Sequence, residues 1–154
     1  MTSDLTNPAL ADLGFLVGTW DMTLSRASFL PDPAATVTGL VEFAVIESGG
    51  LLAMRQMTEP SGPPAASWVF GRDASGPQYT ALYSDGRGVS RVYGMDLGGD
   101  TWRMWRHDPE FSQRFEATVH SDRNTVTGRW DKRAADGPWE HDFDLTYRRR
   151  DASG

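Results

Sequence analysis

The stretch Phe15-Leu16-Val17-Gly18-Thr19-Trp20-Asp21, close to the N-terminus, decides the fold. It joins an apolar, helical lead-in to a long strand that begins at Trp20. Gly18 frees the backbone for a sharp change of direction, and Trp20 supplies the largest apolar side chain available. A Gly-x-Trp at the mouth of the first strand is what a small antiparallel barrel needs to close one end.

The residues before this stretch predict a short helix over 7–16. Asn7 is a suitable cap, and Pro8 suits the first helical position. The apolar residues that follow gather on one side of the helix and are Leu10, Leu13, Phe15 and Leu16. We expect this helix to plug one end of the barrel, and we expect residues 151–154 to form a flexible tail.

After Gly18 the chain alternates between strand-forming segments and turn residues. The first strand is expected to run from Trp20 to about Leu30 and the last from Trp139 to Arg148. The strands expected between them are 37–46, 51–58, 68–71, 79–83, 89–95, 102–106, 111–119 and 126–130. No second helix interrupts them, so the crossovers of an α/β fold have no place.

We therefore predict one all-β domain over residues 1–154, an antiparallel up-and-down barrel of about ten strands with a short N-terminal helix. Closing the barrel removes the exposed sheet edges. A Greek-key sandwich is the alternative, and only the Pro60–Pro64 loop could serve as its long connection. A ten-stranded barrel has a wider interior than an eight-stranded one, which leaves room for a ligand.

Composition narrows the classes of function. The formal net charge is −6 and the basic residues form no extended face, which argues against a nucleic-acid partner. There is no cysteine, so disulfides, zinc thiolates and thiol nucleophiles are excluded. The chain starts without a signal-peptide pattern and has no apolar run long enough to span a bilayer. We expect a cytoplasmic protein that does not interact with membranes.

Period-two alternation assigns the residues that face the interior, provided that no bulge flips a strand. The polar members of this predicted cavity are Gln56, Tyr83, Arg91, Tyr93, Gln113 and His141. The aromatic members are Trp68, Phe70, Phe115 and Phe143. A buried, unpaired Arg91 would require a carboxylate on the protein or on the ligand; the alternative is that its side chain extends to the rim.

His141 stands out because the last strand places it on an aromatic and aliphatic face with Trp139, Phe143 and Tyr147. It could be a hydrogen-bond donor, a proton acceptor or a haem ligand, or an interior histidine satisfied by a neighbour. With Tyr83 or Tyr93 it is also the candidate for general acid–base catalysis. The three histidines are widely separated, so a three-histidine metal site is not expected.

The segment Trp102-Arg103-Met104-Trp105-Arg106-His107 has a tryptophan on each face. One tryptophan must then lie on the outside of the barrel, either partly exposed or covered by a partner chain. A homodimer is one way of covering it.

The chain resembles the calycin group in its Phe15-Leu16-Val17-Gly18-Thr19-Trp20 stretch, its expected ten or so strands, its Trp68-Val69-Phe70-Gly71-Arg72-Asp73 segment and its closing Leu145-Thr146-Tyr147-Arg148-Arg149. Within it the chain looks most like bacterial lipocalin-like proteins of a family of unknown function, DUF1579. The resemblance implies that Arg148 or Arg149 packs across Trp20 and seals the base of the barrel, a structural role shared with Gly18.

More distantly the chain is similar to nitrobindins and fatty-acid-binding-protein-like barrels. The resemblance to nitrobindins implies that His141 could stand in the place of their haem-ligating histidine. This chain, however, has Asp21-Met22-Thr23 where nitrobindins continue with Gly-x-Gly.

The first hypothesis is thus a binding protein that holds a small apolar or aromatic ligand inside the barrel without a cofactor. The alternatives are a small enzyme of the cyclase, isomerase or hydrolase type that uses His141, and a haem protein.

Overall fold

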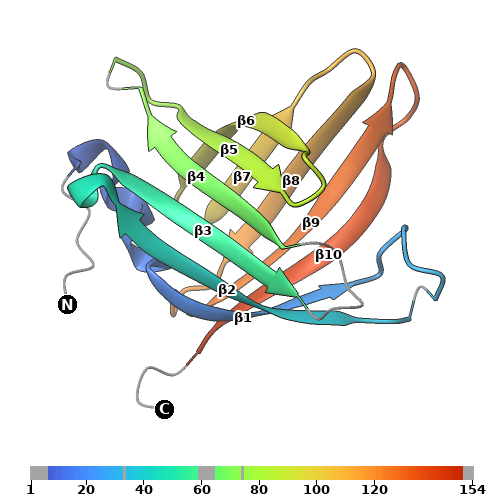
Figure 1. Ribbon diagram of the computed structural model, residues 1–154, viewed down its shortest axis with the longest axis horizontal. Helices are drawn as coiled ribbons and strands as arrows, with labels where there is room; N and C mark the ends of the chain where they lie inside the picture. Colours follow the sequence, from blue (N-terminus) through green and yellow to red (C-terminus); the bar gives the residue numbers. More distant parts are fainter. Residues whose placement is uncertain (1–6, 33, 59–64, 74, 151–154) are drawn as a thin grey trace.

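The chain forms a closed antiparallel barrel, described in a computed structural model for residues 7–32, 34–58, 65–73 and 75–150. The strand order around the barrel is β1-β10-β9-β8-β7-β6-β5-β4-β3-β2. Each strand pairs with the next one in sequence, and β1 pairs with β10 to close the barrel (Figure 1). The predicted up-and-down topology is confirmed, and the Greek-key alternative is wrong. The expected tail and the Pro60–Pro64 loop lie outside the described residues.

The elements follow the turn signals of the sequence closely. In the described segments the 3₁₀ helices are η1 (Pro8–Leu16) and η2 (Glu47–Gly49). The strands are β1 (Gly18–Ser25), β2 (Val37–Ile46), β3 (Leu51–Thr58), β4 (Ala66–Arg72), β5 (Tyr79–Asp85), β6 (Ser90–Gly98), β7 (Thr101–Arg106), β8 (Phe111–Val119), β9 (Thr125–Ala134) and β10 (Glu140–Arg149).

The first strand is shorter than predicted. It ends at Ser25 because Arg26 has a φ of 47°, in the left-handed region that an extended strand cannot contain. The chain therefore leaves the sheet before Leu30 and forms a loop across one end of the barrel. This early exit gives Phe29 and Leu30 a place at the cavity that a continuous strand would not give them.

The other end of the barrel is covered by η1, as expected for the N-terminal helix (Figure 1). Asn7 caps it by accepting a hydrogen bond from the Ala9 N–H at 3.0 Å. Three leucines of η1 are fully buried: Leu10, Leu13 and Leu16. A guanidinium N–H of Arg72 donates to the Ala9 carbonyl at 3.0 Å and ties the helix to β4. Among the described residues, no helix combines the length and the apolar character needed to span a bilayer.

Trp20 is completely buried just behind this helix. Its indole N–H donates to the Leu16 carbonyl at 2.8 Å, and the Arg149 guanidinium lies 4.3 Å above its ring. Gly18 has a φ of 135°, which side-chain-bearing residues rarely adopt. It also leaves room for the Arg149 guanidinium, because a Cβ at this position would lie 3.0 Å from an Arg149 nitrogen. Arg149 therefore holds the sealing position, whereas Arg148 is exposed.

The two tryptophans of β7 separate as the alternation requires. Trp102 is buried inside the barrel. Trp105 lies on the outer wall against Gly94, where an added Cβ would come within 2.5 Å of the indole nitrogen. Because Gly94 has no side chain, the Trp105 indole can pack against β6 of the same chain. The predicted homodimer remains a prediction.

Asp131 forms an ion cluster on the outer wall of β9. It accepts hydrogen bonds from Arg114 at 3.0 Å and from Arg129 at 2.7 and 3.0 Å. Burial by itself raises the pKa of the Asp131 carboxyl, but the two arginines outweigh it and hold that pKa below its ordinary value.

The free energy of unfolding should therefore fall on acidification. Because the folded-state pKa of Asp131 is lowered, the stabilisation is present above about pH 4 and is lost as the pH falls through the folded-state pKa. We expect urea midpoints to decrease between pH 6 and pH 3, and to decrease less steeply in Asp131→Asn. The control is Asp136→Asn in an exposed turn. An unchanged slope in Asp131→Asn would contradict this assignment.

Candidate functional site

A cavity of about 630 Å³ opens at the end of the barrel opposite η1. Its walls come from the inward faces of the strands, and its rim includes Phe29 and Leu30 of the β1–β2 loop. Below the cavity the barrel is filled with side chains, among them Phe43, Phe70 and Phe115. The interior is thus divided into a packed lower half and an open upper half.

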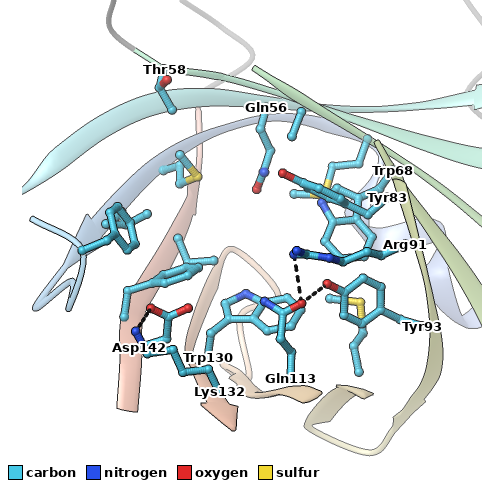
Figure 2. Close-up of a pocket in the computed structure, with 18 of the residues that line it drawn as sticks. Gln56, Thr58, Trp68, Tyr83, Arg91, Tyr93, Gln113, Trp130, Lys132 and Asp142 are labelled. Carbon is cyan, nitrogen blue, oxygen red and sulfur yellow. Dashed lines mark hydrogen bonds and ion pairs between the residues drawn. The ribbon is translucent and has the colours of Figure 1, made fainter. Parts of the chain in front are cut away.

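Aromatic rings form much of the cavity wall (Figure 2). The Trp68 ring lies 5.1 Å from Tyr93 and 6.1 Å from Trp130, and the Tyr93 and Trp130 rings are 5.6 Å apart. Phe143 continues this wall at 6.3 Å from Trp130. Contacts at these separations hold each ring in place. The wall therefore offers a preformed apolar surface from β4, β6, β9 and β10.

A polar group lies on the β6–β8 side of the cavity. The carbonyl oxygen of the Gln113 side chain accepts a hydrogen bond from the Tyr93 hydroxyl at 2.5 Å and one from Arg91 at 3.3 Å. Burial raises the pKa of Tyr93, although Arg91 opposes the shift. Tyr93 is therefore a protonated donor at neutral pH rather than a phenolate.

Tyr83 lies beside this group at the rim. Its hydroxyl donates to Asp85 at 2.6 Å, and Asp85 in turn forms an ion pair of 2.7 Å with Arg87. Burial and then the Asp85 carboxylate raise the pKa of Tyr83 well above its ordinary value. The hydrogen bonds from Arg87 and then Tyr83 keep the pKa of Asp85 low. Tyr83 is thus also a donor, and its proton is already engaged by the protein.

A second polar group lies on the neighbouring strands β9 and β10, where Lys132 pairs with Gln113 of β8 (Figure 2). Lys132 approaches Asp142 to 3.7 Å and donates to the Ser28 hydroxyl at 2.8 Å. That hydroxyl donates to Asp142 at 2.8 Å, and the Ser28 backbone N–H donates to the Asp142 carbonyl at 2.7 Å. These bonds tie the β1–β2 loop to the barrel wall. The charges of this group are satisfied within the protein.

His141 does not line the cavity, contrary to the prediction from alternation. The register of β10 against β9 shifts between His141 and Phe143, so Asp142 is an extra residue in the strand. Asp142 and Phe143 both line the cavity. Residues of β10 before the bulge therefore face the opposite side of the sheet from the one predicted. His141 pairs with Asp131 on the outer wall, and its ring contacts Asp144 at 2.7 Å.

Most of the other predicted binding residues do meet at the cavity. Those that line it are Gln56, Trp68, Tyr83, Arg91, Tyr93, Gln113 and Phe143. Phe70 and Phe115 face inward but belong to the packed half, where Phe70 stacks on Trp68 at 6.0 Å. The candidate catalytic set separates, since Tyr83 and Tyr93 reach the cavity whereas His141 does not.

Several lining residues were not predicted. Trp130 and Lys132 follow the same period-two pattern on β9: Trp130 ends the predicted strand 126–130, and a longer ninth strand would have included Lys132. Tyr147 was assigned to the correct face but not to the site; its hydroxyl donates to Gln56 at 3.2 Å. Asp142 carried no such signal, because only the bulge turns it inward.

The arrangement does not fit a haem with a histidine ligand. His107, His120 and His141 are all absent from the cavity lining. In the part of the chain that the structure describes, no cluster of histidine, aspartate and glutamate side chains could hold a metal ion.

Comparison with solved structures confirms the barrel. The chain is similar to the structure described as "Crystal Structure of Rv2717c from M. tuberculosis", with a TM-score of 0.69 and 15% sequence identity. The match covers 94% of this chain and 98% of that chain. At this identity the likeness shows the fold alone. No protein-family model matches the chain, and no curated protein is significantly similar in sequence.

Proposed function

We propose that the protein binds a small apolar or aromatic molecule in the upper half of the barrel. The observation that carries this proposal is the cavity of about 630 Å³ with its aromatic wall. Ligand pockets commonly have volumes of about 300–1,000 Å³ and apolar linings with a few polar groups. The residues that would supply contact area are Trp68, Tyr93, Trp130 and Phe143.

Packing supports the same role. Protein interiors are close-packed and leave few voids larger than a water molecule. Here ten strands enclose more space than the side chains fill, while the lower half around Phe43 and Phe70 shows that this sequence does pack tightly elsewhere. The open half is therefore specific to one end of the barrel, the end that the β1–β2 loop borders.

The alternatives from the sequence have less support. An acid–base enzyme would need a group with a suitable pKa at the cavity, but Tyr83 and Tyr93 hold their protons and His141 lies off the cavity. Membership of the calycin group and of DUF1579 stays a prediction of the sequence resemblance.

Blocking the cavity from one wall tests this proposal. Ala66 lines the cavity, whereas its neighbour Ser67 is exposed on the outside of β4. We expect the wild-type protein to bind the neutral fluorescent probe N-phenyl-1-naphthylamine, and we expect Ala66→Phe to weaken that binding by at least about tenfold. Fluorescence titration gives both dissociation constants.

The matched control is Ser67→Phe, which adds the same ring to the outer wall. It should bind the probe like the wild-type protein. Circular dichroism and thermal melting establish that both variants are folded. Binding that is absent in the wild-type protein, or equally strong in a folded Ala66→Phe variant, would refute the proposed function.

A further inference from the structure

We propose that the preferred ligand is an organic anion, a carboxylate attached to an aromatic or aliphatic body, and that Arg91 with the Gln113 amide binds the carboxylate. This inference rests on the proposed function and specifies the ligand class of the same cavity. It is carried by the charges around the cavity and by the way in which each one is, or is not, neutralised by the protein.

Among the residues that the structure describes, the cavity lining contains more basic than acidic side chains. Its basic residues are Arg87, Arg91 and Lys132, and its acidic residue is Asp142. This balance is opposite to that of the whole chain, which has a formal net charge of −6. The excess of positive charge is thus a local feature of the site.

Two of the three cations are neutralised within the protein. Arg87 has its ion pair with Asp85 at 2.7 Å, and Lys132 approaches Asp142 to 3.7 Å while donating to Ser28. Arg91 is different. Its guanidinium donates to Gln113 at 3.3 Å, also acts on the Tyr93 hydroxyl and lies 5.3 Å from the centre of the Phe111 ring, but it forms no ion pair with a described residue.

Arg91 therefore presents a charge without a carboxylate partner among the described residues. A guanidinium has five N–H donors in a planar fork that matches the two oxygens of a carboxylate. A ligand that displaces water from this cavity would leave the charge both desolvated and unpaired unless it brought an anion. An apolar ligand without a charge would pay that desolvation penalty.

Gln113 adds donors at the same place. Its carbonyl oxygen already accepts hydrogen bonds from Tyr93 and Arg91, which orients the amide. In the described part of the chain, the amide nitrogen has no hydrogen-bond partner. Figure 2 shows Arg91 and Gln113 reaching toward the middle of the cavity from the β6–β8 side, next to Trp68 and Trp130. A carboxylate would meet donors from both side chains while its apolar body lies against the indole rings.

A pair of ligands with nearly the same shape tests the charge alone. 2-Naphthoate and 2-naphthamide share a ring system, and at pH 7 only the acid is charged. Displacement of N-phenyl-1-naphthylamine measures both affinities. We expect the wild-type protein to prefer the acid by about tenfold or more, since charge-assisted bidentate hydrogen bonds are the strong ones. In Arg91→Gln that preference should disappear.

The charge control is Arg103→Gln, which removes one positive charge from the exposed outer-wall pair with Glu116. It should keep the preference for the acid. Thermal melting checks that Arg91→Gln is folded, and Arg91→Lys should restore part of the preference because it restores the charge.

The outcomes separate the two proposals. If the wild-type protein binds the probe but binds acid and amide equally, the carboxylate inference is wrong and the proposed function stands. If Arg91→Gln keeps the preference for the acid, the anion is bound elsewhere and Arg91 is not its partner. If neither the probe nor either naphthyl ligand binds, the proposed function fails and the inference fails with it.

Discussion

Trp20→Ala should lower the free energy of unfolding by about 3–5 kcal/mol, the range found when large buried aromatic side chains are truncated. Trp20 is fully buried, contacts Phe43 at a ring separation of 6.4 Å and lies under the Arg149 guanidinium. The substitution leaves a void behind η1 and removes the hydrogen bond to Leu16. Urea unfolding followed by circular dichroism measures the loss.

The expected loss of stability depends on where the tryptophan lies, so Trp105→Ala is the matched comparison. Trp105 is the same residue type but lies on the outer wall against Gly94, and its truncation should cost about 1–2 kcal/mol. Trp20 is not among the residues that line the cavity. A Trp20→Ala protein that folds with normal stability but loses the ability to bind N-phenyl-1-naphthylamine would show that this residue serves binding rather than closure.

Replacing Arg149 by methionine should cost about 2–4 kcal/mol, because several acceptors, two of them partly buried carbonyl oxygens, would lose their donor together. The guanidinium donates to the Val17 carbonyl at 3.0 Å and to the Asn124 side-chain oxygen at 2.8 Å, and it also donates to the Phe15 carbonyl. It thereby joins the end of η1, the β8–β9 turn and β10. Methionine keeps a long apolar stem, so most of the expected loss reflects the hydrogen bonds.

Arg148→Met is the control, because the neighbouring arginine is exposed. Removing the same charge there should change the free energy of unfolding by less than about 0.5 kcal/mol. Equal losses in the two variants would mean that net charge, and not the sealing position over Trp20, determines the effect. Chemical denaturation of both proteins at one pH and salt concentration makes the comparison direct.

Local sequence was sufficient for the architecture. Residues such as Gly49, Gly88 and Gly99 sit at positive φ in turns between strands, and turn residues of this kind separate nearly every strand. Alternation placed Arg91, Tyr93 and Gln113 on inward faces of β6 and β8. Turn residues and alternation both depend only on residues close together in the chain, so they can be recognised without knowledge of the fold.

Alternation failed where one residue changed the register. The bulge at Asp142 depends on how β10 meets β9, and it turned His141 outward and Asp142 inward. The early end of β1 depends likewise on the conformation of Arg26, which frees Phe29 and Leu30 for the rim. A single extra residue reverses every assignment that precedes it, because side chains alternate with a period of two.

The contrast extends to the candidate site. The Gly18-x-Trp20 opening and the spacing of apolar residues were enough to predict a barrel of about ten strands with a helix at its end. They did not show that the lower half is packed and the upper half open, that Arg149 rather than Arg148 covers Trp20, or that Arg91 alone among the lining cations lacks a carboxylate in the described chain. Those features arise from contacts between strands that are distant in sequence, and pairing of charges across a barrel exists only once the barrel is closed.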